Sequence, residues 1–300
     1  MLRISSLVVN SMLRLSGFVG KQSNHYTLKV GEAGAPRLTL LNELCNPHTF
    51  SFIKKVTSLE NKRILDVGCG IGILSSAFAV HALPKGSVLG VDISAEQLQI
   101  ADERAKKENI ANIKFQQVAA ENIDQLHETF DIIYFRFTLM HLQNATMVIE
   151  KVLSLMHEES VLICEEASDI QTLCCNPPEH VFDKWKKAVE KQVELSNSDF
   201  TIGKKLIDII SEQQLTLMHA ETAQPVIETA RLKQQLWQGV QEISALLVAS
   251  GFCSEPEIEE MIAELKVFAN TSTAKIGFFN YLQVAAKKNE IKVEKPVCRL

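Results

Sequence analysis

The segment from Arg63 to Gly72 constrains the fold of this chain more than any other part of the sequence. It reads RILDVGCGIG, a short apolar run that ends in an acid and is followed by glycines at alternate positions. An amphipathic stretch, residues 73–82, comes next. This order predicts a buried strand, a tight glycine turn and a helix that begins at the turn. Because glycine has no Cβ, the backbone can bend sharply here and a ligand can approach it closely.

The glycine spacing separates two classes of nucleotide-like ligand. The dinucleotide fingerprint G-x-G-x-x-G/A needs a small last residue, but counting from Gly68 this position holds Ile73. Counting from Gly70 it holds Ser75, which keeps only the small size. Asp66 lies two residues before the first glycine, where a carboxylate would repel a pyrophosphate but would suit a ligand carrying an ammonium group. The pattern therefore favours a zwitterionic nucleoside over a dinucleotide.

The D-x-G-x-G-x-G form of residues 66–72 resembles the first motif of the class I S-adenosylmethionine-dependent methyltransferases. The resemblance implies an α/β fold: a Rossmann-like, seven-stranded, mostly parallel sheet with helices on both faces and a helical substrate cover. It also implies S-adenosylmethionine as the cofactor. The residues of the turn that are expected to bind it are Asp66, Gly68, Cys69, Gly70 and Gly72.

A second strand is predicted over residues 86–92, and it ends in Asp92. An acid at this place accepts hydrogen bonds from ribose hydroxyls in many nucleoside-binding α/β folds. Asp92 is therefore expected to bind the ribose, with Ile93 next to it in the cofactor site. Ser94 is expected to cap the following helix, residues 95–107.

A third predicted strand, residues 113–118, leads to a turn that departs from the resembled family. That family usually carries an acid here, which receives the adenine amino group, but this chain has Ala119. The backbone N–H of Ala120 is expected to serve the adenine ring. Glu121 or Asn122 is the candidate for the missing acceptor.

The fourth predicted strand, residues 130–135, is followed by RFTLMHL, which resembles bacterial small-molecule methyltransferases. The resemblance implies that Arg136 pairs with the carboxylate at the methionine end of the cofactor. His141 is the candidate general base, which is needed only if the acceptor is a poor nucleophile such as a hydroxyl. A capping or buried structural histidine is the alternative. His180 and Tyr134 are weaker candidates for the base.

The rest of the chain is expected to complete the sheet and to cover the ligand. Residues 1–31 contain no Asp or Glu, which is typical of a leader or of a transit peptide, and we favour a leader. The predicted regions are a leader at 1–31, the cofactor-binding core at 32–168, a helical cover insertion at 169–201, the remaining core strands at 202–286 with a helical insertion at 228–270, and a tail at 287–300.

Several finer predictions concern single elements of this plan. Two helices, 35–44 and 48–59, are expected before the glycine turn, and a weaker resemblance places Tyr26 and Arg37 across the cofactor. The fifth strand is predicted at 160–165 after a turn at 156–159, and the last strand at 276–286. The remaining predictions concern side chains. Glu165, Glu166 and Asp169 are expected to be solvated loop acids or a polar substrate site, whereas Phe182, Trp185 and Trp237 are expected to line an apolar pocket or to pack the cover.

Composition limits the partners and the compartment. The net charge of −5 argues against a nucleic-acid substrate, and 46% hydrophobic residues can bury a sizeable core. No run of about 18 apolar residues is present, so no membrane-spanning helix is expected. Seven cysteines without a C-x-x-C pair are typical of free thiols in the cytoplasm, and metal-ligand spacing is absent.

These observations predict methyl transfer from S-adenosylmethionine to a small, partly apolar metabolite by in-line displacement. Two other classes stay open. One is a nicotinamide-dependent oxidoreductase on the same sheet, and the other is a methyltransferase-like protein that binds the cofactor or a partner without turnover. The acceptor atom cannot be identified from the sequence, and a homodimer stays open.

Overall fold

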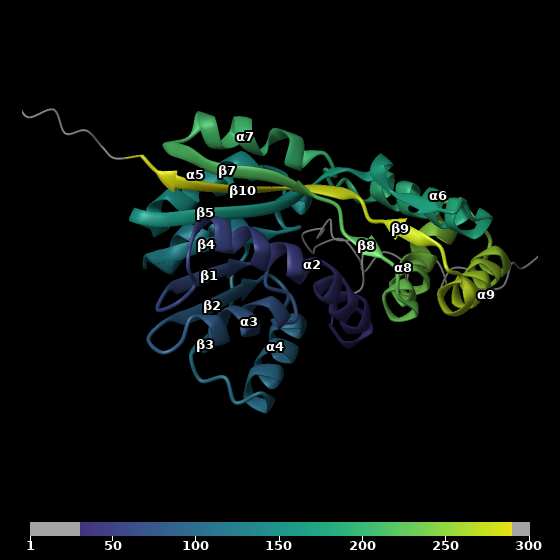
Figure 1. Cartoon of the computed structure of the whole chain (residues 1–300), viewed down its shortest axis with the longest axis horizontal. Helices are drawn as coiled ribbons and strands as arrows, with labels where there is room; N and C mark the ends of the chain where they lie inside the picture. The colour runs from purple at the N-terminus through teal and green to yellow at the C-terminus, as the bar shows by residue number, and fades with distance from the viewer. Residues whose placement is uncertain (1–30, 290–300) are drawn as a thin grey trace, which may run out of the picture.

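A computed structural model describes residues 31–289, which form a seven-stranded sheet flanked by helices and a second, mainly helical part at one end of the sheet (Figure 1). The sheet has the order β3-β2-β1-β4-β5-β10-β7. All its strands are parallel except β10, which is antiparallel to both of its neighbours. The strands of this sheet are β1 (Arg63–Val67), β2 (Ser87–Asp92), β3 (Ile113–Gln117), β4 (Phe130–Arg136), β5 (Met156–Asp169), β7 (Leu215–Ala223) and β10 (Asn280–Lys288).

Alternating side chains on the strands bury both faces of the sheet, which is why the strands read as nearly continuous apolar runs. On one face, Ile64 and Ile132 pack under helices α2 (Ala35–Val56) and α3 (Ile73–His81). On the other face, Leu65 and Ile133 pack under helices α5 (Ala145–Val152) and α7 (Ile202–Glu212). Helix α4 (Ala95–Lys107) packs beside β3. Because these strands run parallel, their carboxyl ends all lie at one edge of the sheet.

The second part, which we call the cover, lies beyond that edge, where Figure 1 shows its helices gathered on the right. Its helices are α6 (His180–Ser196), α8 (Ala230–Ala249) and α9 (Glu255–Thr271), and its small antiparallel sheet contains β6 (Cys174–Asn176), β8 (Val226–Ile227) and β9 (Lys275–Gly277). A separate apolar cluster, which includes Trp185, Leu236 and Leu265, fills the cover. The cover thus has a hydrophobic core of its own.

The structure confirms the predicted seven-stranded sheet but corrects several elements. The two helices expected before the glycine turn form the single helix α2, which continues through Pro47 because its apolar side, including Leu44 and Phe52, packs on the sheet and α8. Strand β5 begins at Met156, so the expected turn at 156–159 is part of an irregular strand. The last predicted strand divides into β9 and β10, which belong to different sheets.

The predictions for the leader, for Tyr26 and for most of the tail lie outside the described residues. Within residues 31–289, no helix has the length and apolar character that crossing a bilayer would require.

Candidate functional site

The glycine turn after β1 has all three glycines in the left-handed backbone region, with φ values of 75° at Gly68, 55° at Gly70 and 70° at Gly72. A Cβ on Gly68 would collide with the side chain of Thr138, and one on Gly72 would lie 2.7 Å from Cβ of Ala101. These two glycines therefore serve close packing as well as the turn. A Cβ on Gly70 would meet only Gln97 Oε1, at 3.3 Å, so the backbone of Gly70 is the most open to a ligand.

The ends of β1 and β2 meet at Asp92. Its Oδ2 accepts a hydrogen bond from the N–H of Gly70 at 2.9 Å, and its Oδ1 accepts one from the N–H of Ser94 at 2.9 Å. Burial raises the pKa of Asp92, which these backbone donors oppose. Ser94 caps α4 as predicted, by accepting from the N–H of Gln97. The structure therefore brings the predicted ribose acid against the glycine turn.

Two residues that follow Asp92 in the chain are candidates for contact with a ligand. Ile93 is 51% exposed although it is aliphatic. The side chain of Gln97 is buried, yet its Oε1 has no hydrogen-bond partner. A buried acceptor without a donor is uncommon in native proteins, and a ligand donor is one explanation for it.

Asp66 lies inside the protein, with 3% of its surface exposed. Its Oδ2 accepts a 2.5 Å hydrogen bond from Ser75 Oγ on α3. Burial raises the pKa of Asp66 to about 6, while the bond from Ser75 and the charge of Arg136 act to lower it. The carboxyl is thus ionised above about pH 6 and can then attract a cationic group.

After β3, Ala119 precedes a short helical segment, residues 120–126, that begins with the predicted adenine-contacting residues Ala120 and Glu121. The backbone carbonyl of Glu121 accepts a hydrogen bond from Lys151 on α5. This contact holds the segment against α5. The role of Glu121 or Asn122 as the acceptor for an adenine amino group stays a prediction.

Arg136, at the end of β4, donates hydrogen bonds to three side chains of α2. Its Nη1 donates to Asn46 Oδ1 at 2.9 Å and to Thr49 Oγ1 at 3.2 Å, and its Nη2 donates to Asn42 Oδ1 at 2.6 Å. Burial acts to lower the pKa of Arg136, but the neighbouring Tyr134 and other acidic groups raise it overall. The guanidinium is therefore charged and held against α2, and its contact with a cofactor carboxylate stays a prediction.

Glu165 and Glu166 are fully buried in β5, so the expectation of solvated loop acids is wrong for both. The strand is longer than predicted, because β10 pairs with it as far as Asp169. Glu165 accepts hydrogen bonds from Thr49 Oγ1 at 2.7 Å and from Gln283 Nε2 at 3.0 Å. Only Asp169 is a surface acid, and it pairs with Lys204 at 2.7 Å.

Glu166 lies on the opposite face of the strand and binds backbone donors of residues 138–140. Burial raises its pKa to about 8, although these three N–H groups act to lower it. This role of Glu166 was not predicted from the sequence. The two consecutive acids inside an apolar strand were the available signal, because buried acids need partners.

His141 lies in the short helical turn Leu139–His141, and its Nδ1 is 2.8 Å from Ser198 Oγ at the end of the cover. Burial and then the charge of Arg37 lower the pKa of His141 to about 4. Arg37 itself pairs with Glu242 of α8 at 2.9 Å. The imidazole is therefore neutral at pH 7, which suits a hydrogen-bonding group better than an efficient general base.

The aromatic residues Phe182, Trp185 and Trp237 pack within the cover. Phe182 and Trp185 are buried with ring centroids 5.4 Å apart, and Trp237 is partly buried beneath Lys266. At the boundary with the sheet, Phe137 has a φ of 50°, unusual for a bulky side chain, and its ring contacts Phe279 and Tyr281. This strained residue directly follows Arg136, and backbone strain often accompanies functional sites.

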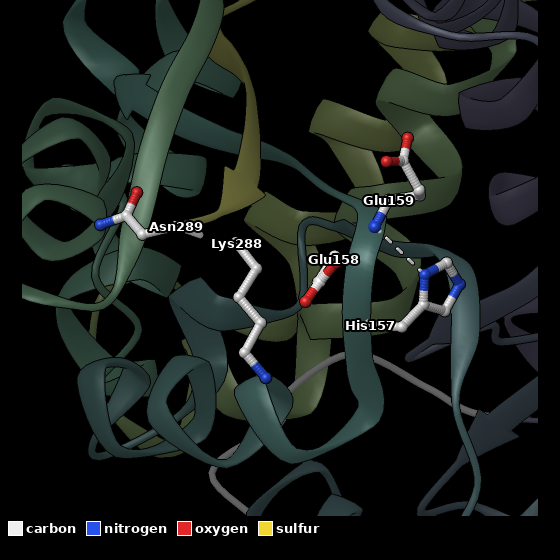
Figure 2. Close-up of a pocket in the computed structure, with 5 residues that line it drawn as sticks. All are labelled: His157, Glu158, Glu159, Lys288 and Asn289. Carbon is white, nitrogen blue, oxygen red and sulfur yellow. Dashed lines mark hydrogen bonds between the residues drawn. The ribbon is translucent and has the colours of Figure 1, made fainter. Parts of the chain in front are cut away.

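A surface hollow on the sheet lies away from these residues. Figure 2 shows it lined by His157, Glu158, Glu159, Lys288 and Asn289. Lys288 donates to the carbonyl of Met156, the first residue of β5, and to that of Leu153 in the turn just before it. The hollow is therefore at the opposite edge from the glycine turn and is separate from the candidate site.

Comparisons with known proteins identify the family. A methyltransferase domain family matches residues 58–243, which is more than half of the chain. An uncharacterized methyltransferase of Schizosaccharomyces pombe is 29% identical over 170 residues, covering 55% of this chain and 58% of the relative. A ubiquinone biosynthesis O-methyltransferase of Haemophilus ducreyi is 36% identical over 125 residues, covering 40% and 51%. The chain thus spans about half the length of these curated relatives.

A solved structure supports the fold. The YcgJ protein of Bacillus subtilis superposes with a TM-score of 0.53 at 17% identity, over 80% of this chain and 97% of that one. The sheet order, the glycine turn and the match over residues 58–243 agree with one another. They confirm the class indicated by the sequence, and the chain belongs to the methyltransferase domain family.

Proposed function

We propose that this chain transfers a methyl group from S-adenosylmethionine to a small, partly apolar molecule. The observation that carries the proposal is the contact between the glycine turn and Asp92, in which the N–H of Gly70 binds the carboxylate at the end of β2. This contact fixes an acid beside an open stretch of backbone. Nucleosides bind at such a place in parallel α/β sheets.

The residues around this contact fit the cofactor. Asp92 has acceptor capacity beyond its two backbone donors, which suits a ribose diol. The exposed side chain of Ile93 offers an apolar surface to a base, and the unsatisfied Oε1 of Gln97 offers an acceptor. S-adenosylmethionine would supply a methyl group that is already activated on a positively charged sulfur.

Opposite charges on neighbouring strands support a zwitterionic ligand. Arg136 on β4 is close enough to Asp66 on β1 for its charge to act to lower the pKa of Asp66. Both side chains lie on the sheet face that carries α2 and α3. The acid suits an ammonium group and the guanidinium suits a carboxylate. A nicotinamide dinucleotide offers neither amino-acid group.

The acceptor is proposed from the cover and from the relatives. The cover is filled with apolar and aromatic residues, and it meets the core at His141 and Phe137. Two groups of relatives are named for ubiquinone biosynthesis and for demethylmenaquinone, and such names support a small, partly apolar acceptor here. The neutral His141 would orient an acceptor hydroxyl or receive its proton.

Calorimetric titration of the purified chain tests the identity of the cofactor. We expect micromolar binding of S-adenosylmethionine and S-adenosylhomocysteine and no heat with NAD. Binding of NAD alone would replace the proposal with an oxidoreductase. The chain could also bind the cofactor and yet transfer no methyl group to any quinone precursor or other small phenol that is tried. That result would favour the alternative in which the protein acts without turnover.

We also propose a cytoplasmic location and a small-molecule acceptor in preference to nucleic acid. Free thiols at the cysteines of residues 31–289 support the first, and the net charge of −5 supports the second. Light scattering of the purified chain tests the homodimer that the sequence left open.

A further inference from the structure

Glu166 accepts a set of hydrogen bonds that the proposed methyl transfer does not by itself require. Its side chain is fully buried in β5. Its Oε1 accepts hydrogen bonds from the N–H groups of Thr138 at 2.9 Å and Leu139 at 2.8 Å, and its Oε2 accepts one from Met140 at 3.3 Å. One carboxyl group thus holds three successive donors of the turn that follows β4.

This turn, residues 138–141, is joined to the glycine turn. Thr138 Oγ1 donates a hydrogen bond to the carbonyl of Val67 at 3.1 Å, at the last residue of β1. The side chain of Thr138 also occupies the space in which a Cβ on Gly68 would lie. A displacement of the 138–141 turn would therefore press on Gly68 or leave it unsupported.

The same turn is joined to the cover at its other end. The carbonyl of Met140 accepts a hydrogen bond from the N–H of Asp199 at 2.8 Å. His141 Nδ1 lies 2.8 Å from Ser198 Oγ. Residues 198 and 199 belong to the connection between α6 and α7, so these bonds tie the cover to the sheet edge.

We propose that Glu166 is a positioning residue that couples the cofactor turn to the cover. It holds residues 138–141 in one arrangement, so that a ligand bound against Gly68 and Gly70 stabilises the contacts of Ser198 and Asp199. The cover is then ordered over the acceptor when the cofactor is present. This inference rests on the proposed function, because it needs a ligand at the glycine turn.

The substitution Glu166→Gln tests the coupling with little change of shape. A glutamine oxygen can still accept from Thr138 and Leu139, but its NH2 group would face the N–H of Met140, and two donors cannot bond to each other. The part of the turn that carries the Asp199 contact is then displaced. Glu159→Gln is the matched control, since Glu159 is an exposed acid on the same strand at the opposite edge.

The experiment measures amide exchange at Asp199 with and without S-adenosylhomocysteine, together with the affinity for that probe. In the unchanged chain and in Glu159→Gln we expect the probe to slow exchange at Asp199 about tenfold, within the usual range of coupling between sites. In Glu166→Gln we expect the slowing to fall below about twofold while the affinity changes less than about threefold.

The outcomes separate this inference from the proposed function. Failure of the probe to bind the unchanged chain overturns both. Binding that protects the glycine turn but leaves Asp199 unchanged, or equal protection in Glu166→Gln, overturns the coupling alone. If Glu166→Gln does not fold, Thr138→Val takes its place, because it removes the bond to Val67 with little change of volume. Retained protection of Asp199 in that variant overturns the coupling.

Discussion

The cofactor edge of the sheet and the cover are stabilised in different ways. At the sheet edge, Asp66, Glu165 and Glu166 are buried carboxyls, and each accepts hydrogen bonds from named donors. In the cover, aliphatic and aromatic side chains such as Trp185 and Leu236 fill the interior. Many charges of the cover pair near its surface, as Lys184 does with Glu264.

The two regions are therefore sensitive to different changes. A buried carboxyl has a raised pKa, so the stability of the sheet edge depends on pH. The cover also buries Lys233, which donates to the carbonyl of Ser272, and Glu242, which pairs with Arg37. Trp185 lies among apolar side chains, so the stability that it provides depends on volume and packing. Four substitutions test this contrast, and Trp185→Ala has the largest expected effect.

Trp185→Ala should lower the free energy of unfolding by about 3–5 kcal/mol, because it empties a large volume in the cover core. Denaturant titration at pH 5.5 and at pH 8 measures the loss, which should be equal at both. Trp237→Ala is the control, with a smaller loss expected because Trp237 is only partly buried. A loss that differs by more than about 1 kcal/mol between the two pH values would contradict the contrast.

Glu166→Gln should reduce the pH dependence of stability. An unfolded glutamic acid ionises near pH 4.5, whereas the pKa of Glu166 in the fold is about 8. The folded chain therefore holds an additional proton between these values, and its free energy of unfolding falls as the pH rises. The raised pKa values of Asp66 and Glu165 act with the same sign.

Denaturant titration from pH 5 to pH 8 measures this slope, to which one proton contributes up to about 1.4 kcal/mol per pH unit. We expect the slope to become shallower in Glu166→Gln and to stay unchanged in Glu159→Gln. An unchanged slope in the first variant would show that Glu166 is ionised in the fold throughout this range.

Asp92→Ala should weaken S-adenosylhomocysteine binding at least tenfold, about 1.4 kcal/mol, because the ribose loses its acceptor. It should also release the N–H of Gly70. Calorimetry measures the affinity. Asp102→Ala is the control, since Asp102 lies on the exposed side of α4 and pairs with Lys106. An unchanged affinity in Asp92→Ala would remove the ribose assignment.

His141→Ala should reduce turnover by less than about tenfold and leave cofactor affinity near normal. A pKa of about 4 makes the imidazole a weak base, so its contribution falls below the usual gain of general-base catalysis. Initial rates from pH 5.5 to pH 8 measure it, and His141 should add no titration in that range. Unchanged turnover would remove the catalytic role of His141 and leave only a structural contact with Ser198.

Much of the sheet was predictable, because its signals are local. The glycines of residues 68–72, the acid Asp92 and the cap Ser94 each follow from residues a few positions away. The bonds of Arg136 to Asn42 and Asn46 join residues about ninety positions apart, and no local pattern records them. The site roles of Asp92, Arg136 and His141 stay predictions that ligand-binding measurements test.

The cover was harder to predict. Strands β6, β8 and β9 contain two or three residues each, too few to show alternation. The division of the last strand depends on Phe278, whose N–H binds the carbonyl of Pro225 far along the chain. Such elements are determined by the tertiary structure more than by their own sequence.

The place of β10 has a consequence for synthesis of the protein. This strand lies between β5 and β7, and it is the last of the described strands to leave the ribosome. Until residue 288 has emerged, β5 and β7 each keep an unpaired edge, and such edges invite pairing with other nascent chains. A chain released from the ribosome before Asn280 has been added lacks β10, the strand that joins β5 to β7.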